Sequence, residues 1–410
     1  MKLSKLELRW LLLILLAGIA FRLLSTVYLK HQPASDELAY LSMAENFLQG
    51  NGIRDGLGNW AFYNAGYPMF ILLPFAYLFG DLILGARVAN IFLGCLSILG
   101  CYYLAREIGL GLFGRLVSSG VYSFYLPTGV YAVYIAKETL LGLLMLLVAY
   151  LTIRTYKHIS SLNVILLGVL FAGIAMVGNA GLSLLLPLFL VLFFAPGSLT
   201  RRFFSGLAVV SIAAVLVSPW LVRNLEVVGA PVLNTNGGFN LYLGNNSAAT
   251  GYFMSIVDTP LGNDWQQLRR SAGEFESGNI LKKMAVDWIV ENPTSFLKLA
   301  IKKAFLFWWP PTHQGQGDGG GGIERVVRLL WLGQFLFIVA FSLVALFSYA
   351  PRKLEVLFLF FIVISYTAVH MVFYVIYRYR EPIMPVVIVL CAAGIEASIA
   401  WYRSKFINVL

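Results

Sequence analysis

Long apolar runs separated by short polar segments make up most of this chain. Many of the runs have about 20 residues, the length that a helix needs to cross the hydrocarbon core of a bilayer. The expected spans are residues 6–29, 82–104, 113–132, 138–153, 162–178, 181–195, 203–221, 326–349, 354–376 and 382–401. The pattern therefore predicts an all-α polytopic membrane protein with about ten transmembrane helices.

One apolar segment, residues 67–80, is too short for a full span and is interrupted by Pro74. If it crossed the membrane, every basic cluster after it would fall on the opposite side. We therefore expect a re-entrant or interfacial helix on the outer side, in addition to the spans.

Basic residues cluster at alternate helix ends, which sets the expected orientation. Clusters on one common side include Lys5 and Arg9, Arg154 and Lys157, Arg201 and Arg202, and Arg403 and Lys405. The positive-inside rule makes this side the cytoplasm and places both termini there. The net charge of +10 therefore indicates topology rather than nucleic-acid binding, in a chain that is 59% hydrophobic and 12% charged.

Two substantial polar segments, residues 30–66 and 223–325, fall on the outer side. They divide the chain into an N-terminal transmembrane module (1–222), an extracytoplasmic loop with interfacial helices (223–325) and C-terminal transmembrane helices (326–410). Within the loop we expect helices at 279–291 and 294–309 and a Gly-rich connector at 314–322. Nucleotide-activated donors and ATP are scarce on this side of the membrane, and the sequence has no phosphate-binding Gly-rich motif. An activated substrate is therefore expected to arrive on a lipid carrier.

The pair Asp36 and Glu37 opens the first outer segment, directly after the first span. Charged side chains at a membrane surface are costly unless they are solvated, paired or functional. The pair could supply a general base for an acceptor hydroxyl or hold a divalent cation, or it could cap an interfacial helix. Apart from that cation, no metal site is predicted, and Cys95, Cys101 and Cys391 show no ligand or disulfide spacing.

Several basic side chains lie at outer helix ends, where topology does not require them. Arg378 and Arg380, flanked by tyrosines, suit a lipid phosphate or pyrophosphate. Further candidates for the phosphate are Lys137, Arg223 and Arg54. Ordinary interfacial anchoring or ion pairing is the alternative for each of them.

An aromatic loop in the first outer segment could form the wall of a sugar site, although an interfacial aromatic belt would have the same composition. Arg87, at the outer end of a span, faces protein and could have a purely structural part. For the sugar or acceptor pocket we name Tyr40, Trp60, Tyr63, Asn64, Tyr67, Glu138 and Arg87.

With these features, the chain resembles the GT-C superfamily of polytopic glycosyltransferases, among the bacterial enzymes similar to protein O-mannosyltransferases and aminoarabinose transferases. The resemblance rests on Asp36-Glu37 with Tyr40, Gly66-Tyr67-Pro68, Ala86-Arg87-Val88-Ala89-Asn90, Pro219 to Asn224, Gly237 to Asn246, and Arg378-Tyr379-Arg380 with Pro382 and Pro385.

The resemblance implies an inverting transfer of a sugar from a polyprenyl-phosphate donor to a glycan, lipid or protein acceptor at the outer face of a bacterial plasma membrane. It also implies that Asp36 is the catalytic carboxylate. The chain departs from the pattern at Ala65-Gly66-Tyr67-Pro68, which lacks the family's Lys-Pro-Pro motif, so Arg54, Lys137 or Arg378 would have to replace that lysine.

Two other classes of membrane protein would use the same basic side chains at the outer ends of the helices. A transporter or flippase for a lipid-linked sugar needs inverted repeats and broken helices, which the sequence does not show. A polymerase or ligase of lipid-linked glycans is expected to carry an outer loop rich in Arg and His, whereas residues 223–325 are richer in Asn and Gly.

Overall fold

The computed structural model describes residues 4–310, 322–349 and 353–406, and this part of the chain is helical without a named strand. The predicted all-α class is confirmed. The α-helices are α1 (Lys5–Tyr28), α2 (Asp36–Leu48), α3 (Leu73–Phe79), α4 (Leu82–Glu107), α5 (Leu112–Ser123), α6 (Leu126–Val130), α7 (Glu138–Lys157), α8 (Ser161–Val177), α9 (Leu185–Phe194), α10 (Leu199–Val228), α11 (Gly237–Gly244), α12 (Asp264–Glu291), α13 (Pro293–Trp308), α14 (Gly322–Ser348), α15 (Leu354–Val372) and α16 (Met384–Phe406). Short π or 3₁₀ segments are η1 (Pro68–Leu72), η2 (Asn179–Leu184), η3 (Ile256–Asp258) and η4 (Tyr377–Ile383).

Seven helices in the described ranges are long and apolar enough to cross a membrane. They correspond to α1, α4, α7, α10, α14, α15 and α16 together with η4, and shorter apolar helices occur at Pro68–Phe79, Ser161–Val177 and Asn179–Phe194. The chain is a multi-pass membrane protein. The expected span at 113–132 is instead broken at Phe124 and Tyr125, because Pro127 lacks a backbone N–H and lies in the first turn of the separate helix α6.

The helices α4, α7 and α16 form the interior of the bundle, and much of the buried hydrophobic core lies on them. Close contact between α14 and α16 depends on Gly394, since a Cβ there would lie 1.8 Å from the carbonyl oxygen of Phe341. Small residues permit such approaches between helices that cannot rely on a hydrophobic driving force.

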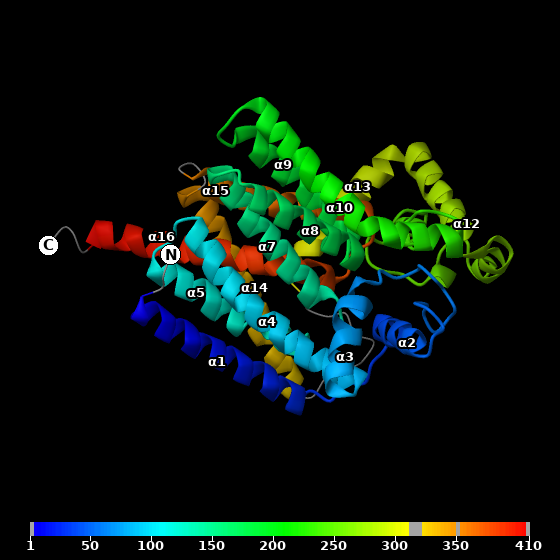
Figure 1. The fold of residues 1–410 in the computed structure, drawn as a ribbon, viewed down its shortest axis with the longest axis horizontal. Helices are drawn as coiled ribbons and strands as arrows, with labels where there is room; N and C mark the ends of the chain where they lie inside the picture. Colours follow the sequence, from blue (N-terminus) through cyan, green and yellow to red (C-terminus); the bar gives the residue numbers. More distant parts are fainter. Residues whose placement is uncertain (1–3, 311–321, 350–352, 407–410) are drawn as a thin grey trace.

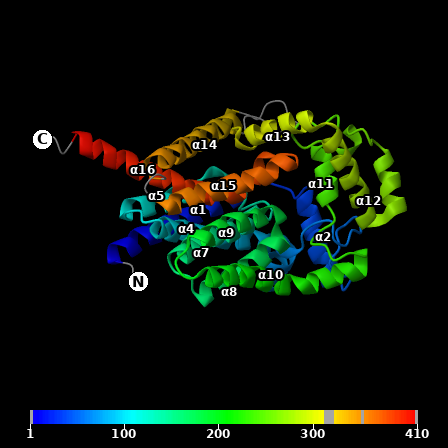
Figure 2. The same ribbon diagram turned by 90° about the horizontal axis from the view of Figure 1, so that it is seen from above.

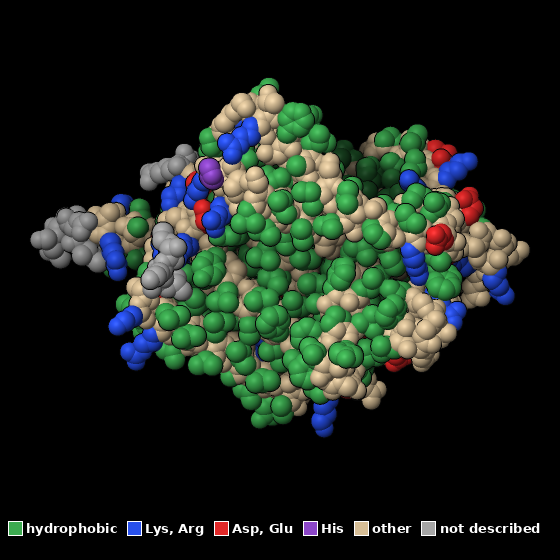
Figure 3. Space-filling view, viewed as in Figure 1, with side chains coloured by type: hydrophobic (Ala, Val, Ile, Leu, Met, Phe, Trp, Pro, Cys, Tyr) green, Lys and Arg blue, Asp and Glu red, His purple; other side chains and the backbone are tan. Residues whose placement is uncertain are grey.

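Both chain ends lie at one end of the bundle, whereas α2, α11 and α12 lie at the other (Figures 1 and 2). The face in Figure 3 is hydrophobic across its middle, with the charged side chains mostly towards the two ends. This distribution is the one that a bilayer imposes on a protein that spans it. It also separates α2 and its carboxylates from the end that carries the termini.

Several element boundaries differ from the sequence-based expectation. The expected module boundaries at 222/223 and 325/326 fall inside α10 and α14. The helix expected at 279–291 begins at Asp264 and contains a break at Gly273, whose φ of 77° a side chain rarely adopts. The expected connector at 314–322 lies outside the described residues except for Gly322, which is the first residue of α14.

Candidate functional site

Asp36 is the first residue of α2 and forms an ion pair with Arg378, which lies in η4 near the C-terminal end of the chain. A helix N-terminus favours a negative charge because its backbone N–H groups and its dipole are positive there. The preceding residue, Ser35, has a φ of 53° and a ψ of −120°, which is a strained conformation for a residue with a side chain. The carboxylate that the sequence singled out is therefore held by a specific turn and a specific cation.

Glu138 provides a second carboxylate for the same guanidinium. It is the first residue of α7, is buried, and has its Oε1 3.7 Å from Nε of Arg378. Lys137, the residue before it, lines the same cavity, and burial lowers the pKa of its ammonium although Glu138 and Asp36 partly offset that effect. Two cations and two carboxylates from three separate parts of the sequence thus meet at the outer end of the bundle.

Glu37 does not join Asp36 in this cluster. Its carboxylate lies 2.6 Å from Nε2 of His31 and accepts hydrogen bonds from the N–H groups of Ile135 at 2.7 Å and Ala34 at 3.1 Å. His31 in turn stacks on Tyr134, with ring centroids 3.8 Å apart. Glu37 therefore fastens the segment before α2 to the segment before α7, which is a positioning role rather than the catalytic one predicted.

The two acidic side chains do not fit the divalent cation that the sequence suggested. Asp36 is directed to a guanidinium and Glu37 to donors, whereas a hard cation needs several oxygens converging on one point. Within the described ranges, no group of three or more His, Cys, Asp or Glu side chains is placed to hold a metal ion.

An apolar groove of about 630 Å³ ends at the Asp36–Arg378 pair. Its apolar walls come from α1, α6 and α14, and His31, Glu37 and Glu138 lie at its polar end. The apolar residues that line it include Phe21, Leu24, Tyr28, Leu126, Val130, Val327 and Trp331.

A larger cavity of about 1080 Å³ meets the groove at this pair. Ser35, Asp36, Tyr40, Glu138, Tyr377 and Arg378 line both spaces. The remaining walls of the cavity mix aromatic and polar side chains from the outer segments, including Phe62, Tyr63, Phe239, Trp265 and Arg269. An apolar space and a more polar one therefore share a boundary that contains this ion pair.

Tyr40 and Tyr63 line this cavity, as predicted, and pack edge to face with ring centroids 6.0 Å apart. Burial raises the pKa of the Tyr40 hydroxyl well above its usual value, and the Asp36 charge adds to that effect. Tyr67 packs behind Tyr40 and donates a hydrogen bond to Asn90 at 3.2 Å. Tyr67 therefore supports the wall of the cavity and does not line it.

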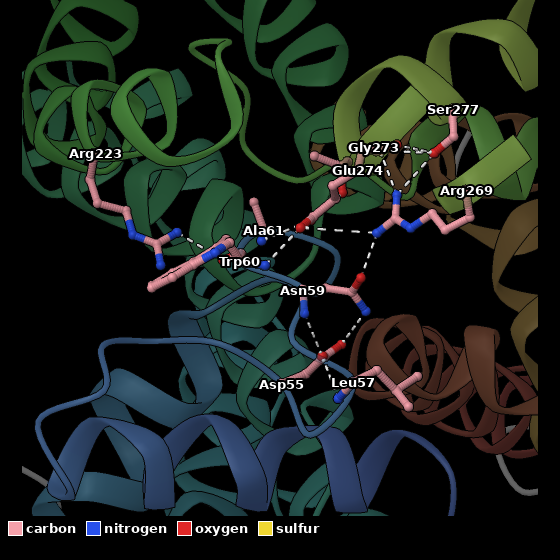
Figure 4. A network of polar contacts seen from close by, with 11 residues as sticks. Asp55, Leu57, Asn59, Trp60, Ala61, Arg223, Arg269, Gly273, Glu274 and Ser277 are labelled. Carbon is pink, nitrogen blue, oxygen red and sulfur yellow. Dashed lines mark hydrogen bonds and ion pairs between the residues drawn. The ribbon is translucent and has the colours of Figure 1, made fainter. Parts of the chain in front are cut away.

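The first outer loop is fixed to α12 by a network of polar contacts (Figure 4). Glu274 accepts hydrogen bonds from the N–H groups of Trp60 at 2.7 Å and Ala61 at 2.9 Å, and from the Thr235 hydroxyl at 2.7 Å. On the other side, Arg269 donates to Asn59, whose amide and backbone N–H donate to Asp55. The network holds the loop that carries the cavity residues Asp55, Asn59, Phe62 and Tyr63.

Arg223 and Arg54 belong to this support and are not brought to the Asp36 cluster. Arg223 donates to the carbonyl oxygens of Trp60 at 2.8 Å and Ile53 at 2.5 Å, and it stacks on Trp60 and Trp220. Arg54 also lies over the ring of Trp60. Trp60 is thus enclosed by cations, so these three residues shape the loop instead of forming the predicted phosphate and sugar contacts.

Arg380 and Arg87 also lie away from the shared boundary of the groove and the cavity. Arg380 is fully buried, donates to the carbonyl oxygen of Trp309 at 2.7 Å and lies over the ring of Phe335 at 4.1 Å. It fastens η4 to the end of α13, so Arg378 alone of the predicted Arg pair faces Asp36. Arg87 lines neither space, and the Nε of its guanidinium has no hydrogen-bond partner in the described part of the chain.

Asn64 lines a separate, smaller pocket and donates to the carbonyl oxygen of Ala175 at 3.2 Å and to Asn179 at 2.8 Å. His31, Arg269 and Glu274 could not be predicted from the sequence, because isolated polar residues in loops and outer helices carry no local signal. The Asn- and Gly-rich stretch around residue 236 is recognisable in the sequence, but its composition alone indicates no specific chemistry.

Comparison with solved structures identifies the fold. AglB, the oligosaccharyltransferase of Archaeoglobus fulgidus in complex with an inhibitory peptide and a dolichol-phosphate, is similar over 99% of this chain, with a TM-score of 0.55 and 11% identity. The same organism's oligosaccharyltransferase in the apo form gives a TM-score of 0.58, with 13% identity over 98% of this chain. The predicted GT-C fold is confirmed.

The chain spans about half the length of these oligosaccharyltransferases, 52% and 51%. ArnT from Cupriavidus metallidurans bound to undecaprenyl phosphate is also similar, with a TM-score of 0.49 and 16% identity over 96% of this chain and 79% of ArnT. No protein-family model and no curated protein sequence matches the chain.

Proposed function

We propose that this protein transfers a sugar from a polyprenyl-phosphate donor to an acceptor hydroxyl at the extracytoplasmic face of a bacterial plasma membrane, with both termini in the cytoplasm. The observation that carries the proposal is the position of the Asp36–Arg378 pair. It lies where an apolar groove of about 630 Å³ meets a polar cavity of about 1080 Å³. A donor of this class has a hydrocarbon tail that needs an apolar groove, a phosphate that needs a cation, and a sugar that needs a polar space.

The groove suits the lipid tail. Its walls come from α1 and α14, whose outward side chains are largely exposed and apolar, as is expected for helices that face lipid. A polyprenyl chain in the groove would leave its phosphate beside Arg378 and within reach of Lys137. A guanidinium binds a phosphate through parallel hydrogen bonds, and an ammonium adds a point charge.

The cavity suits the acceptor. The attacking hydroxyl forms a bond to the anomeric carbon from the face opposite the phosphate, and the bond from that carbon to the phosphate oxygen breaks. Its electron pair leaves on the polyprenyl phosphate, where Arg378 and Lys137 stabilise the added charge. Asp36 accepts the proton of the hydroxyl. Attack from the opposite face inverts the configuration of the anomeric carbon.

The ion pair also has to exchange partners during this cycle. In the structure Arg378 neutralises Asp36, and a donor phosphate would compete for the same guanidinium. Phosphate binding would therefore release the carboxylate towards the acceptor. Glu138 would keep the guanidinium in place while the exchange occurs, since its Oε1 lies 3.7 Å from Nε of Arg378.

The experiment that tests the proposal is a cryo-EM map of the purified protein with undecaprenyl phosphate. We expect density for the phosphate at Arg378 and for the tail in the groove between α1 and α14. A lipid bound elsewhere, or a continuous polar path across the bundle, would favour a transporter and overturn the proposal.

A further inference from the structure

A third pocket, of about 310 Å³, adjoins the cavity at the outer end of the bundle. It shares Lys137, Glu138, Asn236, Asn240, Tyr374 and Tyr379 with the cavity. Its other walls come from the loop before η1, from η2, from α15 and from the segment before α11. The loop, η2 and the segment before α11 bring Asn64, Asn179 and Asn234 to the same space. We call it the amide pocket, after Asn64, Asn179, Asn234, Asn236 and Asn240.

Hydrogen bonds among the asparagines fix part of this wall. The Asn64 amide group donates to the Asn179 side-chain oxygen at 2.8 Å, and the Asn64 side-chain oxygen accepts from Asn234 at 2.9 Å. With a further bond to the carbonyl oxygen of Ala175, both N–H groups of Asn64 are used. The N–H groups of Asn179 and the side-chain oxygen of Asn234 form no hydrogen bond within the described part of the chain.

Other residues of the pocket also have polar groups without protein partners. The Asn240 side-chain oxygen accepts from the Tyr374 hydroxyl at 3.4 Å, which leaves its N–H groups available. Neither the side-chain amide of Asn236 nor the ammonium of Lys137 has a hydrogen-bond partner among the described residues. Each of these atoms is accessible at least in part, because none of them is among the fully buried polar atoms that lack a hydrogen-bond partner in the described part of the chain.

A small space lined by both amide donors and amide acceptors matches a ligand rich in hydroxyls, because each hydroxyl both donates and accepts. Partly buried polar groups without protein partners favour a ligand or water that supplies the missing hydrogen bonds. Charge limits the choice further. The Lys137 ammonium lines the pocket, and its one lining carboxylate in the described ranges, Glu138, faces Arg378. A ligand ammonium would meet a like charge there with no free carboxylate to balance it.

We propose that the amide pocket binds the sugar unit of the donor, that this sugar is a neutral or acidic pyranose, and that a sugar bearing an ammonium group is rejected. This inference rests on the proposed function, because it takes the phosphate to lie beside Arg378. It deepens that function by naming the class of sugar and the residues that select it.

The test compares four lipids bound to the full-length protein in nanodiscs: undecaprenyl phosphate alone, and undecaprenyl phosphate linked to glucose, to glucuronate or to 4-amino-4-deoxyarabinose. We expect the glucose or the glucuronate lipid to bind at least about tenfold tighter than the bare phosphate, which is about 1.4 kcal/mol. The amino-sugar lipid is expected to bind no tighter than the bare phosphate.

The variants Asn179→Ala and Asn236→Ala, combined, are expected to remove the gain from the sugar and to leave the affinity for bare undecaprenyl phosphate unchanged. Asn279→Ala, at a partly exposed asparagine of α12 outside the pocket, is the matched control. Lys137→Met is expected to narrow the difference between the glucose lipid and the amino-sugar lipid.

The outcomes separate the two proposals. If wild-type protein does not bind bare undecaprenyl phosphate, the proposed function is wrong and this inference falls with it. If it binds the bare lipid but no sugar adds affinity, or the amino-sugar lipid binds most tightly, the inference on the amide pocket is wrong and the proposed function stands. Retention of the sugar gain by the double asparagine variant would also contradict the assignment.

Discussion

Asp36 and Arg378 form an ion pair although 342 positions separate them in the chain. The pair joins the start of α2 to η4, and so it links the first outer segment to the last transmembrane helix. Each partner is partly exposed and borders two cavities. A purely structural ion pair gains little in such a position, because water screens it. A functional pair needs this access, since substrate has to reach both groups.

Asp36→Asn is expected to lower the rate of sugar transfer by at least about 100-fold, the contribution typical of a positioned base. The amide cannot accept the hydroxyl proton, whereas Arg378 stays in place. Binding of undecaprenyl phosphate should be equal or tighter, because the carboxylate that competes for the guanidinium is gone. Transfer with the donor that the wild type uses, measured beside lipid binding, tests both parts.

Glu45→Gln is the control for this variant, since Glu45 lies on the same helix and is exposed. It is expected to leave transfer unchanged. Full activity of Asp36→Asn would show that Asp36 does not accept the proton of the acceptor hydroxyl.

Arg378→Lys is expected to weaken the binding of undecaprenyl phosphate about tenfold, and Arg378→Ala more strongly. Lysine keeps the charge but loses the planar fork that binds two phosphate oxygens at once. Titration of the lipid into protein in nanodiscs measures the effect. Arg270→Lys is the comparison, because that exposed guanidinium bonds to its own helix, at the carbonyl oxygen of Gln266. Equal affinities for wild type and Arg378→Ala would place the phosphate elsewhere.

Glu274→Ala is expected to destabilise the first outer loop. Its carboxylate accepts three hydrogen bonds, and hydrogen bonds to a charged group contribute about 1.5–3 kcal/mol each before coupling. Hydrogen–deuterium exchange should rise over residues 53–61 and change little in α4 and α7. Glu276→Ala, which removes an exposed carboxylate near Asn279, serves as control. Unchanged exchange in Glu274→Ala would mean that the network in Figure 4 does not hold the loop.

Lys303 gives a prediction for pH. Its side chain is fully buried in α13, donates a hydrogen bond to Asn245 at 3.1 Å, and has a pKa lowered by burial to about 8. The unfolded chain therefore binds the proton more tightly than the folded protein. This lysine makes the stability rise with pH between about 8 and its unfolded value, and reduces stability below that window.

In the Lys303→Met variant, the rise of folding stability with pH in this window is expected to disappear. The pH dependence of stability outside the window is expected to stay as in the wild type. Thermal unfolding at a series of alkaline pH values across that window measures it, with Lys302→Met as control, because Lys302 is the exposed neighbour in the chain. Parallel profiles for the wild type and Lys303→Met would show that the buried lysine does not titrate in this range.

The sequence predicted the fold class well because the spans depend on composition over long stretches. It predicted less about which neighbouring side chains share a site. Adjacent residues on an α-helix point about 100° apart, so Asp36 faces the cavity and Glu37 faces His31. In a 3₁₀ segment two positions amount to about 240°, which directs Arg380 towards Trp309 while Arg378 faces Asp36.

Contacts between residues that are far apart in the chain could not be predicted from the sequence, because only the tertiary structure brings such residues together. Glu274 lies 214 positions from Trp60 in the chain, and nothing local in α12 indicates that its carboxylate receives that loop. Asn64, Asn179 and Asn234 likewise come from separate segments. Lys137 and Glu138 could be predicted as candidates, because charged residues directly before an apolar span are visible in the sequence itself.

Ser35 connects two parts of the molecule that would otherwise respond to substrate separately. The end of α1 forms a wall of the groove, and residues 29–35 lead from it to Asp36. Because this connection is short, a lipid tail that displaced the end of α1 would also shift the carboxylate of Asp36. Binding of the lipid tail in the groove and orientation of the Asp36 carboxylate would thereby be coupled through one short segment of backbone.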